Sequence, residues 1–263
     1  MVDAQLLHWT LNQVLTALVI LARVGPLIFF MPIIGSSAVP AQVKILFSVM
    51  TALILVSVVP VGPGDLPRSP LGFTVFVASE AIFGGILALF ARFIFAAVQL
   101  AGQMVGIQMG MSMSGIMDPQ FGNQVSPVGQ FWDLVATLLF LSYNGHHLFF
   151  STLVESFQWV RPGGMHITQA TYASLMQGTA HMFVLAIKVM APATAAIFFS
   201  TVAMGIIAKT VPQIPILIVG LPLNIAIGLL FVGLSLSYLL PILVRSFANL
   251  GHVLPQLAAG MGT

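Results

Sequence analysis

The chain has 263 residues, of which 59% are hydrophobic and only 5% are Asp, Glu, Lys or Arg. Soluble domains carry about a quarter charged residues, so 8 Lys and Arg with 6 Asp and Glu are too few to cover a water-facing surface. The composition excludes a soluble globular enzyme and a disordered chain, and it indicates an integral membrane protein. No basic run is present to bind nucleic acid, and there is no cysteine for a disulfide or a thiol nucleophile.

Long apolar runs follow one another along the chain. The first is preceded by Asp3 and by no Lys or Arg, so the basic start of a signal peptide is missing and we expect this run to be retained. A helix needs roughly 20 apolar residues to cross a bilayer core, and an unpaired backbone cannot stay in lipid. We therefore expect an all-α, polytopic membrane protein with about six long helices in hairpins. The runs are residues 14–34, 45–61, 71–100, 131–154, 182–207 and 214–244.

A segment rich in glycine and methionine lies in the middle of the chain. Small residues recur at every fourth position, which predicts one helix face that another backbone can approach closely; they are Gly102, Gly106, Gly110 and Ser114. Five of the 14 methionines lie among them: Met104, Met109, Met111, Met113 and Met117. Two interpretations are open: a tightly packed helix pair followed by a surface loop, or a deformable plug that lines a path through the membrane.

Four charged residues lie well inside the apolar runs: Arg23, Glu80, Arg92 and Lys188. A charge at mid-bilayer costs about 2.5 kcal/mol or more, so each should be paired, reach the interface or face water. Glu80 could serve a proton or ion relay, or it could pair with one of the cations across a helix interface. We favour the pair, because a single buried acid is thin support for a relay.

The sequence offers no catalytic, metal or cofactor site. His146 and His147 are adjacent, so they do not share a helix face, and no acid lies at ligand spacing. No serine, histidine and acid trio, H-E-x-x-H motif or glycine-rich phosphate loop is present. We expect no enzymatic activity, and an intramembrane enzyme is disfavoured.

The last two runs, residues 182–207 and 214–244, predict a helical hairpin around Lys209 and Pro215. Pro192 and Pro222 fall inside these runs and should kink them. The hairpin is either a plain transmembrane pair with bent arms or a pair that curls into a non-planar assembly with other subunits.

Several segments together, in this order, resemble the FliR family, the flagellar export-gate proteins related to the SctT proteins of virulence injectisomes. The resemblance covers nearly the whole chain, and the ordered set is more specific than any one motif. The segments are Arg23-Val24-Gly25-Pro26, Met31-Pro32, Pro40 to Lys44, Glu80 with Gly84-Gly85, the Gly102/Gly106/Gly110 run, Asp118-Pro119, Asn144-Gly145-His146, Val211-Pro212-Gln213 and Gly220-Leu221-Pro222.

The resemblance implies a subunit of the flagellar type III export gate in the bacterial inner membrane, at the flagellar basal body. Such proteins join FliP and FliQ in a helical hetero-oligomer, with FlhB beside it, and unfolded flagellar subunits pass through its pore. The protein would also contact membrane lipid, and it would need no cofactor. Residues 1–177 would form a FliP-like part, and residues 178–263 a FliQ-like hairpin with a short tail. The alternative is a small secondary transporter or ion channel.

Carried onto this chain, the family's plug corresponds to about residues 106–122, which we call the plug segment. We expect its methionines to fill the closed pore and to move aside for export, because thioethers change shape easily. The plug and pore residues implied are Gly106, Met109, Gly110, Met111, Met113, Gly115, Met117 and Phe121.

Overall fold

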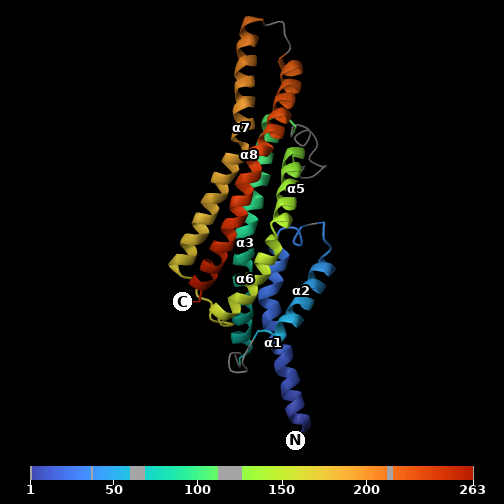
Figure 1. The fold of residues 1–263 in the computed structure, drawn as a ribbon, viewed down its shortest axis with the longest axis vertical. Coiled ribbons are helices and arrows are strands. Elements are labelled where there is room, and N and C mark those ends of the chain that lie inside the picture. The colour runs from blue at the N-terminus through green and yellow to red at the C-terminus, as the bar shows by residue number, and fades with distance from the viewer. Residues whose placement is uncertain (1, 37, 60–68, 112–125, 212–215, 263) are drawn as a thin grey trace. The chain divides into compact units, whose positions relative to one another are not determined.

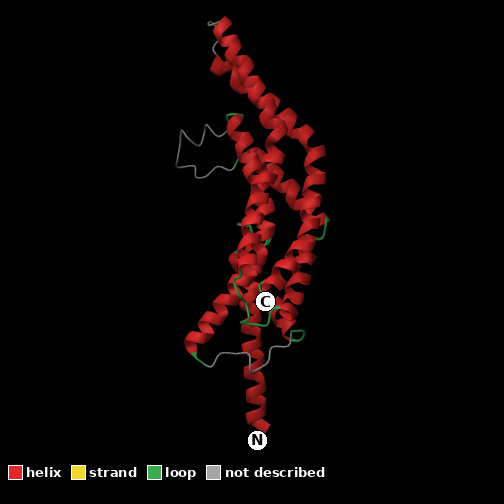
Figure 2. Ribbon diagram, turned by 90° about the vertical axis from the view of Figure 1, so that its left-hand side faces the viewer, coloured by secondary structure: helices red, strands yellow, loops and turns green. Residues whose placement is uncertain are grey.

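The computed structural model describes residues 2–36, 38–59, 69–111, 126–211 and 216–262, with the backbone alone for residues 2–12, 216 and 217. Figure 2 shows only helices, turns and loops in these ranges, which confirms the expected all-α fold. The helices are α1 (Val2–Phe30), α2 (Ala41–Val56), α3 (Pro70–Gln108), α5 (Pro127–Ser142), α6 (Gly145–Trp159), α7 (Gln169–Thr210) and α8 (Ile216–Gly260), as Figure 1 shows.

In the described part of the chain, four helices contain stretches long and apolar enough to cross a membrane. They lie in α1, α3, α7 and α8, so the chain is a polytopic membrane protein. Two of the six expected apolar runs form helices shorter than a full span. The helix in the second apolar run, α2, has 16 residues and ends at Val56. The fourth run is divided between two helices.

That division falls at Asn144, inside the run of residues 131–154 that we expected to form one helix. Asn144 has a φ of 55°, in the left-handed region that Asn tolerates better than most residues. α5 therefore ends at Ser142, and α6 begins at Gly145. At 16 and 15 residues, each is shorter than a full span.

The C-terminal helices are longer than expected. α7 has 42 residues and continues through Pro192, and α8 has 45 and continues through Pro222. Ser200 Oγ donates a hydrogen bond to Asn224 Oδ1 at 2.8 Å and so joins the two helices. The sequence suggested no role for the end of the chain, yet it is ordered as helix to Gly260. There the His166 N–H donates to the Met261 carbonyl oxygen at 2.9 Å.

The chain divides into two compact units by its internal contacts. Unit 1 comprises Met1–Arg92, Asn144–Gly178 and Ala248–Thr263, and unit 2 comprises Phe93–Tyr143 and Thr179–Phe247. Three boundaries therefore fall within α3, α7 and α8, and the fourth falls between α5 and α6. The division expected near residue 177 rests on the family resemblance rather than on packing, and it stays a prediction.

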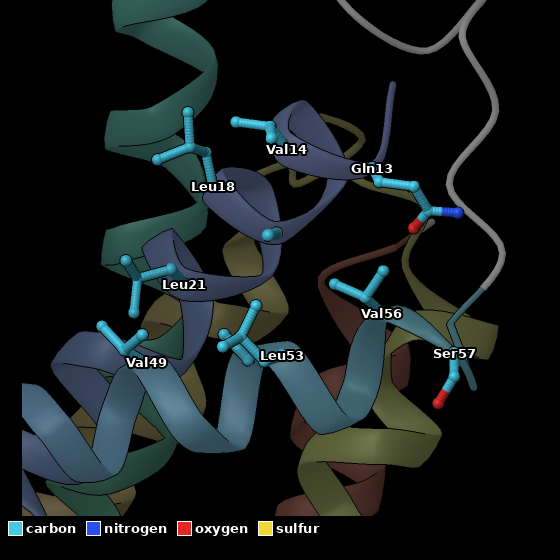
Figure 3. Close-up of a pocket in the computed structure, with 10 residues that line it drawn as sticks. Gln13, Val14, Leu18, Leu21, Val49, Leu53, Val56 and Ser57 are labelled. Atoms are coloured by element: carbon cyan, nitrogen blue, oxygen red, sulfur yellow. The ribbon is translucent and has the colours of Figure 1, made fainter. Parts of the chain in front are cut away.

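In unit 1, α2 packs beside α1 and leaves a hollow of about 590 Å³ between them (Figure 3). Its lining carries no ionisable side chain. The lining residues are Gln13, Val14, Ala17, Leu18, Leu21, Val49, Ala52, Leu53, Val56 and Ser57. The hollow therefore offers no acid, base or metal ligand for chemistry.

In unit 2, three phenylalanines join three helices. Phe95 of α3, Phe140 of α5 and Phe247 of α8 have ring centroids 5.4–5.9 Å apart. Tilted and edge-to-face pairs of this kind add to the stabilisation from their burial. This cluster ties the C-terminal helix to α3 and α5.

A neighbouring pair of glycines in α3 allows a direct test of helix packing. A Cβ on Gly84 would overlap the carbonyl oxygen of Arg23 in α1, whereas a Cβ on Gly85 would meet nothing within 4 Å. Alanine favours a helix interior over glycine by about 0.5–1 kcal/mol. We expect Gly85→Ala to raise the thermal midpoint of the purified protein slightly. Gly84→Ala should lower it, because the overlap costs about 1–3 kcal/mol. Equal effects of the two substitutions would contradict this packing.

Candidate functional site

The C-terminal end of α3 leads directly into the plug segment. Gly110 has a φ of 79°, the Met111 N–H donates to the Gly106 carbonyl oxygen at 3.0 Å, and the Gly110 N–H donates to that of Ile107 at 2.9 Å. These two bonds form a Schellman motif, which ends a helix with one left-handed residue, usually glycine. The helix therefore stops at Gln108, two residues before Gly110.

This helix end corrects one sequence expectation. The small residues were predicted to form a single helical stripe, but the stripe is wrong beyond Gly106, because Gly110 lies in the terminating turn. Ser114 lies outside the described residues. Other residues approach α3 closely at Gly102 and Gly106. A Cβ on Gly102 would overlap the backbone of Gly129, and one on Gly106 would overlap the Ser126 side chain.

Ser126, the first described residue after the plug segment, is fixed against α3. Its N–H donates to Gln103 Oε1 at 3.0 Å, and its side chain lies against Gly106. The described chain therefore resumes at Ser126 beside the C-terminal part of α3. The sequence did not single out Gly129 or Ser126. The only signal that it offered for this contact was an isolated glycine, Gly129, near the start of a helix.

The beginning of the plug segment is held by α8. Met109 is fully buried, and its side chain occupies the space that a Cβ on Gly228 would need. A Cβ on Gly110 would similarly meet Leu221. Met109 thus packs inside unit 2. The role of Gly228 was not apparent from the sequence.

The other plug residues divide into two groups. Met111 is half-buried at the start of the segment. The rest lie outside the described residues: Met113, Gly115, Met117 and Phe121.

In unit 1, Arg23 and Glu80 form a buried ion pair that joins α1 to α3. Arg23 Nε lies 2.5 Å from Glu80 Oε2, and both side chains are 0% exposed. Arg23 Nη2 donates to Glu80 Oε1 at 3.2 Å, and the Gly163 N–H donates to the same oxygen at 2.8 Å. Both carboxylate oxygens are therefore engaged. This confirms the pairing interpretation of Glu80.

Further groups satisfy the rest of the guanidinium. Arg23 Nη1 donates to Ser156 Oγ at 3.1 Å, and Nη2 donates to the Val160 carbonyl oxygen at 3.3 Å. The guanidinium carbon lies 4.3 Å from the ring centroid of Phe83 and 4.1 Å from that of Phe157. A buried cation is tolerated when its donors are paired in this way. The pair therefore links α1, α3, α6 and the turn that follows α6.

The other two intramembrane cations, Arg92 and Lys188, are exposed. The Arg92 guanidinium lies 6.0 Å from the ring centroid of Phe30. Within the described ranges, neither cation has a carboxylate oxygen within 4.0 Å. Each exposed cation in an apolar helix costs about 2.5–3.5 kcal/mol if it faces hydrocarbon. Both are therefore candidates for contacts outside this chain.

The histidines do not converge with acids. The His146 and His147 rings lie 4.4 Å apart, and the described residues contain no group of three or more His, Asp or Glu that could hold a metal ion.

The family model and the similar proteins agree with one another. The model of the family "Bacterial export proteins, family 1" matches residues 14–250. The chain is 31% identical to the flagellar biosynthetic protein FliR of Bacillus subtilis (strain 168) over 251 residues, 93% of this chain and 95% of that protein. It is 27% identical to FliR of Escherichia coli (strain K12) over 238 residues, 90% of each. It is 28% identical to FliR of Caulobacter vibrioides over 229 residues, 87% of this chain and 91% of that protein.

Because Arg23 and Glu80 neutralise each other, we expect the loss of one charge to destabilise the fold more than the loss of both. Glu80→Gln leaves the Arg23 cation buried without a counter-charge, which should lower the free energy of unfolding by about 3–5 kcal/mol. Arg23→Met combined with Glu80→Met removes both charges and should cost less than Glu80→Gln alone. Thermal midpoints and membrane abundance of the variants check this. A double variant as unstable as the sum of its single changes would contradict the pairing.

Proposed function

Because the chain belongs to the bacterial export proteins, family 1, we propose that it is a subunit of the flagellar protein export gate and forms part of the pore for unfolded flagellar subunits. The observation that carries this proposal is the family match over residues 14–250, together with FliR relatives aligned along about nine-tenths of the chain. The protein is a multi-pass protein of the bacterial inner membrane, with four helices long enough to span it among the described residues.

We further propose that the plug segment closes this pore. The described residues on either side of residues 112–125 are fixed, since Ser126 lies against Gly106 of α3 and Met109 packs against Gly228 of α8. A segment held at both ends can deform without leaving the path. The methionines beyond Met109 would supply a pliable seal, because the thioether side chain adapts its shape at low cost.

The proposed partners are FliP and FliQ in the gate core, with FlhB beside it. Support comes from the apolar surface of the C-terminal hairpin, where only 22% of the most apolar stretch of α7 and 28% of that of α8 is buried within the chain. Phe199 of α7 and Leu234 of α8 are 70% and 64% exposed. We propose that partner helices cover part of this surface, and that lipid covers the remainder.

A secondary transporter or ion channel is the rival function. A proton relay along its path would need an ionisable group open to the proton. Glu80, the carboxylate predicted as a possible relay, has both oxygens engaged by Arg23 and Gly163. The observed pairing therefore favours the gate over a relay through Glu80.

Co-purification tests the proposed function. When the tagged chain is expressed with FliP and FliQ of the same bacterium, we expect all three in a complex stable in detergent. The same gene should restore flagellar export in a strain that lacks its own copy. The chain reconstituted alone into liposomes should move no small solute.

Solute transport by the chain alone, or purification without either partner, would contradict the proposal. Glu80→Gln is a useful negative control, because it should reduce the amount of complex by destabilising the fold rather than by altering the pore.

A further inference from the structure

In unit 1, α3 presents an exposed apolar face that ends at a cation. Val75, Ile82 and Leu89 lie seven residues apart, so they share a face of the helix, and each is exposed. Arg92 follows Leu89 by three residues on this face and is also exposed. With a rise of 1.5 Å per residue, residues 71–89 are roughly 27 Å long, which is close to the thickness of the hydrocarbon core of a bilayer. The apolar face is therefore long enough to meet one thickness of lipid, and Arg92 lies at its end.

A second helix, α1, ends at the same level. Its apolar stretch long enough to cross a membrane is Gln13–Phe30. Phe30 is 49% exposed, and its ring centroid lies 6.0 Å from the Arg92 guanidinium carbon, at the outer limit of a cation–π contact. Arg92 thus marks the end of two apolar stretches at once. Long cationic side chains near the end of an apolar helix reach the boundary between lipid and water.

The Arg92 guanidinium has donors to offer to a ligand. It carries five N–H groups, and among the described residues it has no hydrogen-bond acceptor and no carboxylate oxygen within 4.0 Å. Lys44, a second cation near the end of α1, differs because it is buried and its Nζ donates to the carbonyl oxygens of Gly35 and Ser36 at 3.1 and 2.8 Å. Lys44 Nζ also lies 5.9 Å from the ring centroid of Phe29. Lys44 therefore holds the turn after α1, whereas the donors of Arg92 are available.

We propose that Arg92 binds the phosphate of an anionic phospholipid at this end of unit 1. Phospholipid headgroups lie where the apolar helices end, and the planar fork of a guanidinium matches two phosphate oxygens with parallel hydrogen bonds. Lys44 adds a second positive charge, and in the described ranges no carboxylate lies within 4.0 Å of either cation to attract the ammonium group of a zwitterionic lipid. The rings of Phe29 and Phe30 already face these two cations. The site therefore favours phosphatidylglycerol over phosphatidylcholine, independently of the proposed gate.

A carboxylate on a partner helix is the other possible source of an acceptor. The exposed side chains beside Arg92 are apolar, namely Leu89 on α3 and Phe30 on α1. A partner's carboxylate packed against them would lose its contact with water, and that desolvation offsets much of the attraction to the cation. A lipid headgroup keeps its other phosphate oxygens in water while it binds. The surroundings of Arg92 therefore favour lipid.

Binding of phospholipids to the purified full-length chain tests this proposal. The probes are phosphatidylglycerol and phosphatidylcholine with the same acyl chains, added to the chain in detergent and counted as bound molecules by native mass spectrometry. We expect phosphatidylglycerol to bind about fivefold more tightly, as one cation at a membrane surface can provide. Arg92→Gln should abolish this preference. Arg92→Lys should keep part of it, because an ammonium retains the charge but not the fork.

Arg245→Gln is the matched control, because Arg245 is also an exposed arginine in an apolar helix and has no aromatic ring against it in the described part of the chain. This variant should keep the preference for phosphatidylglycerol. Equal binding of the two lipids by the unmodified chain would overturn the proposal. So would a preference that survives in Arg92→Gln, or one that Arg245→Gln lowers as much as Arg92→Gln does.

The same measurement on the complex with FliP and FliQ distinguishes lipid from a partner's carboxylate. We expect Arg92→Gln to abolish the preference for phosphatidylglycerol at this site in the complex as well. If Arg92→Gln lowers lipid binding to the chain alone but has no effect in the complex, a partner group holds the guanidinium and the proposal is wrong. The proposed gate would stand in that case, because the complex has formed.

Discussion

The close approach of α3 to α5 is the contact on which the rest of the candidate site depends. Gly129 lies so close to Gly102, and Ser126 so close to Gly106, that a Cβ on Gly102 or on Gly106 would have no room. This contact places Ser126 beside Gly106 of α3 and brings Gln99 within hydrogen-bond distance of Asp133. Because α8 holds Met109 with Gly228, the C-terminal hairpin fixes the same point.

A second constraint acts in unit 1, where every donor of a buried cation needs a partner. Arg23 is surrounded by a carboxylate, a hydroxyl, a carbonyl and two aromatic rings, drawn from helices far apart in the sequence. This arrangement specifies how α1, α3 and α6 pack, even where its net contribution to stability is small, since desolvation offsets much of the ionic attraction. The two units thus use different means, an ion pair in one and glycine contacts with an aromatic cluster in the other.

Much of this architecture could be predicted from the sequence. Composition and long apolar runs indicated a helical membrane protein, and the cost of a charge within an apolar run indicated that Glu80 pairs with a cation. Asn144-Gly145 indicated the end of a helix-like run, where the structure has its break. The sequence did not indicate the stop at Gly110, because Gly110 continues the four-residue spacing of small residues and only its left-handed conformation ends the helix. Nor could it reveal Gly228 opposite Met109 or Asp133 opposite Gln99, because these contacts join helices that only the tertiary fold brings together.

The central claim is that residues beyond the anchored Met109 close a protein-conducting pore. Ion conductance of the purified complex with FliP and FliQ, reconstituted into a planar bilayer, tests it most directly when residues 112–117 are removed and the Gly110 turn is kept. The account predicts that the complex still assembles and that its ion conductance rises well above that of the intact complex. An assembled complex whose conductance is unchanged by this deletion would contradict it.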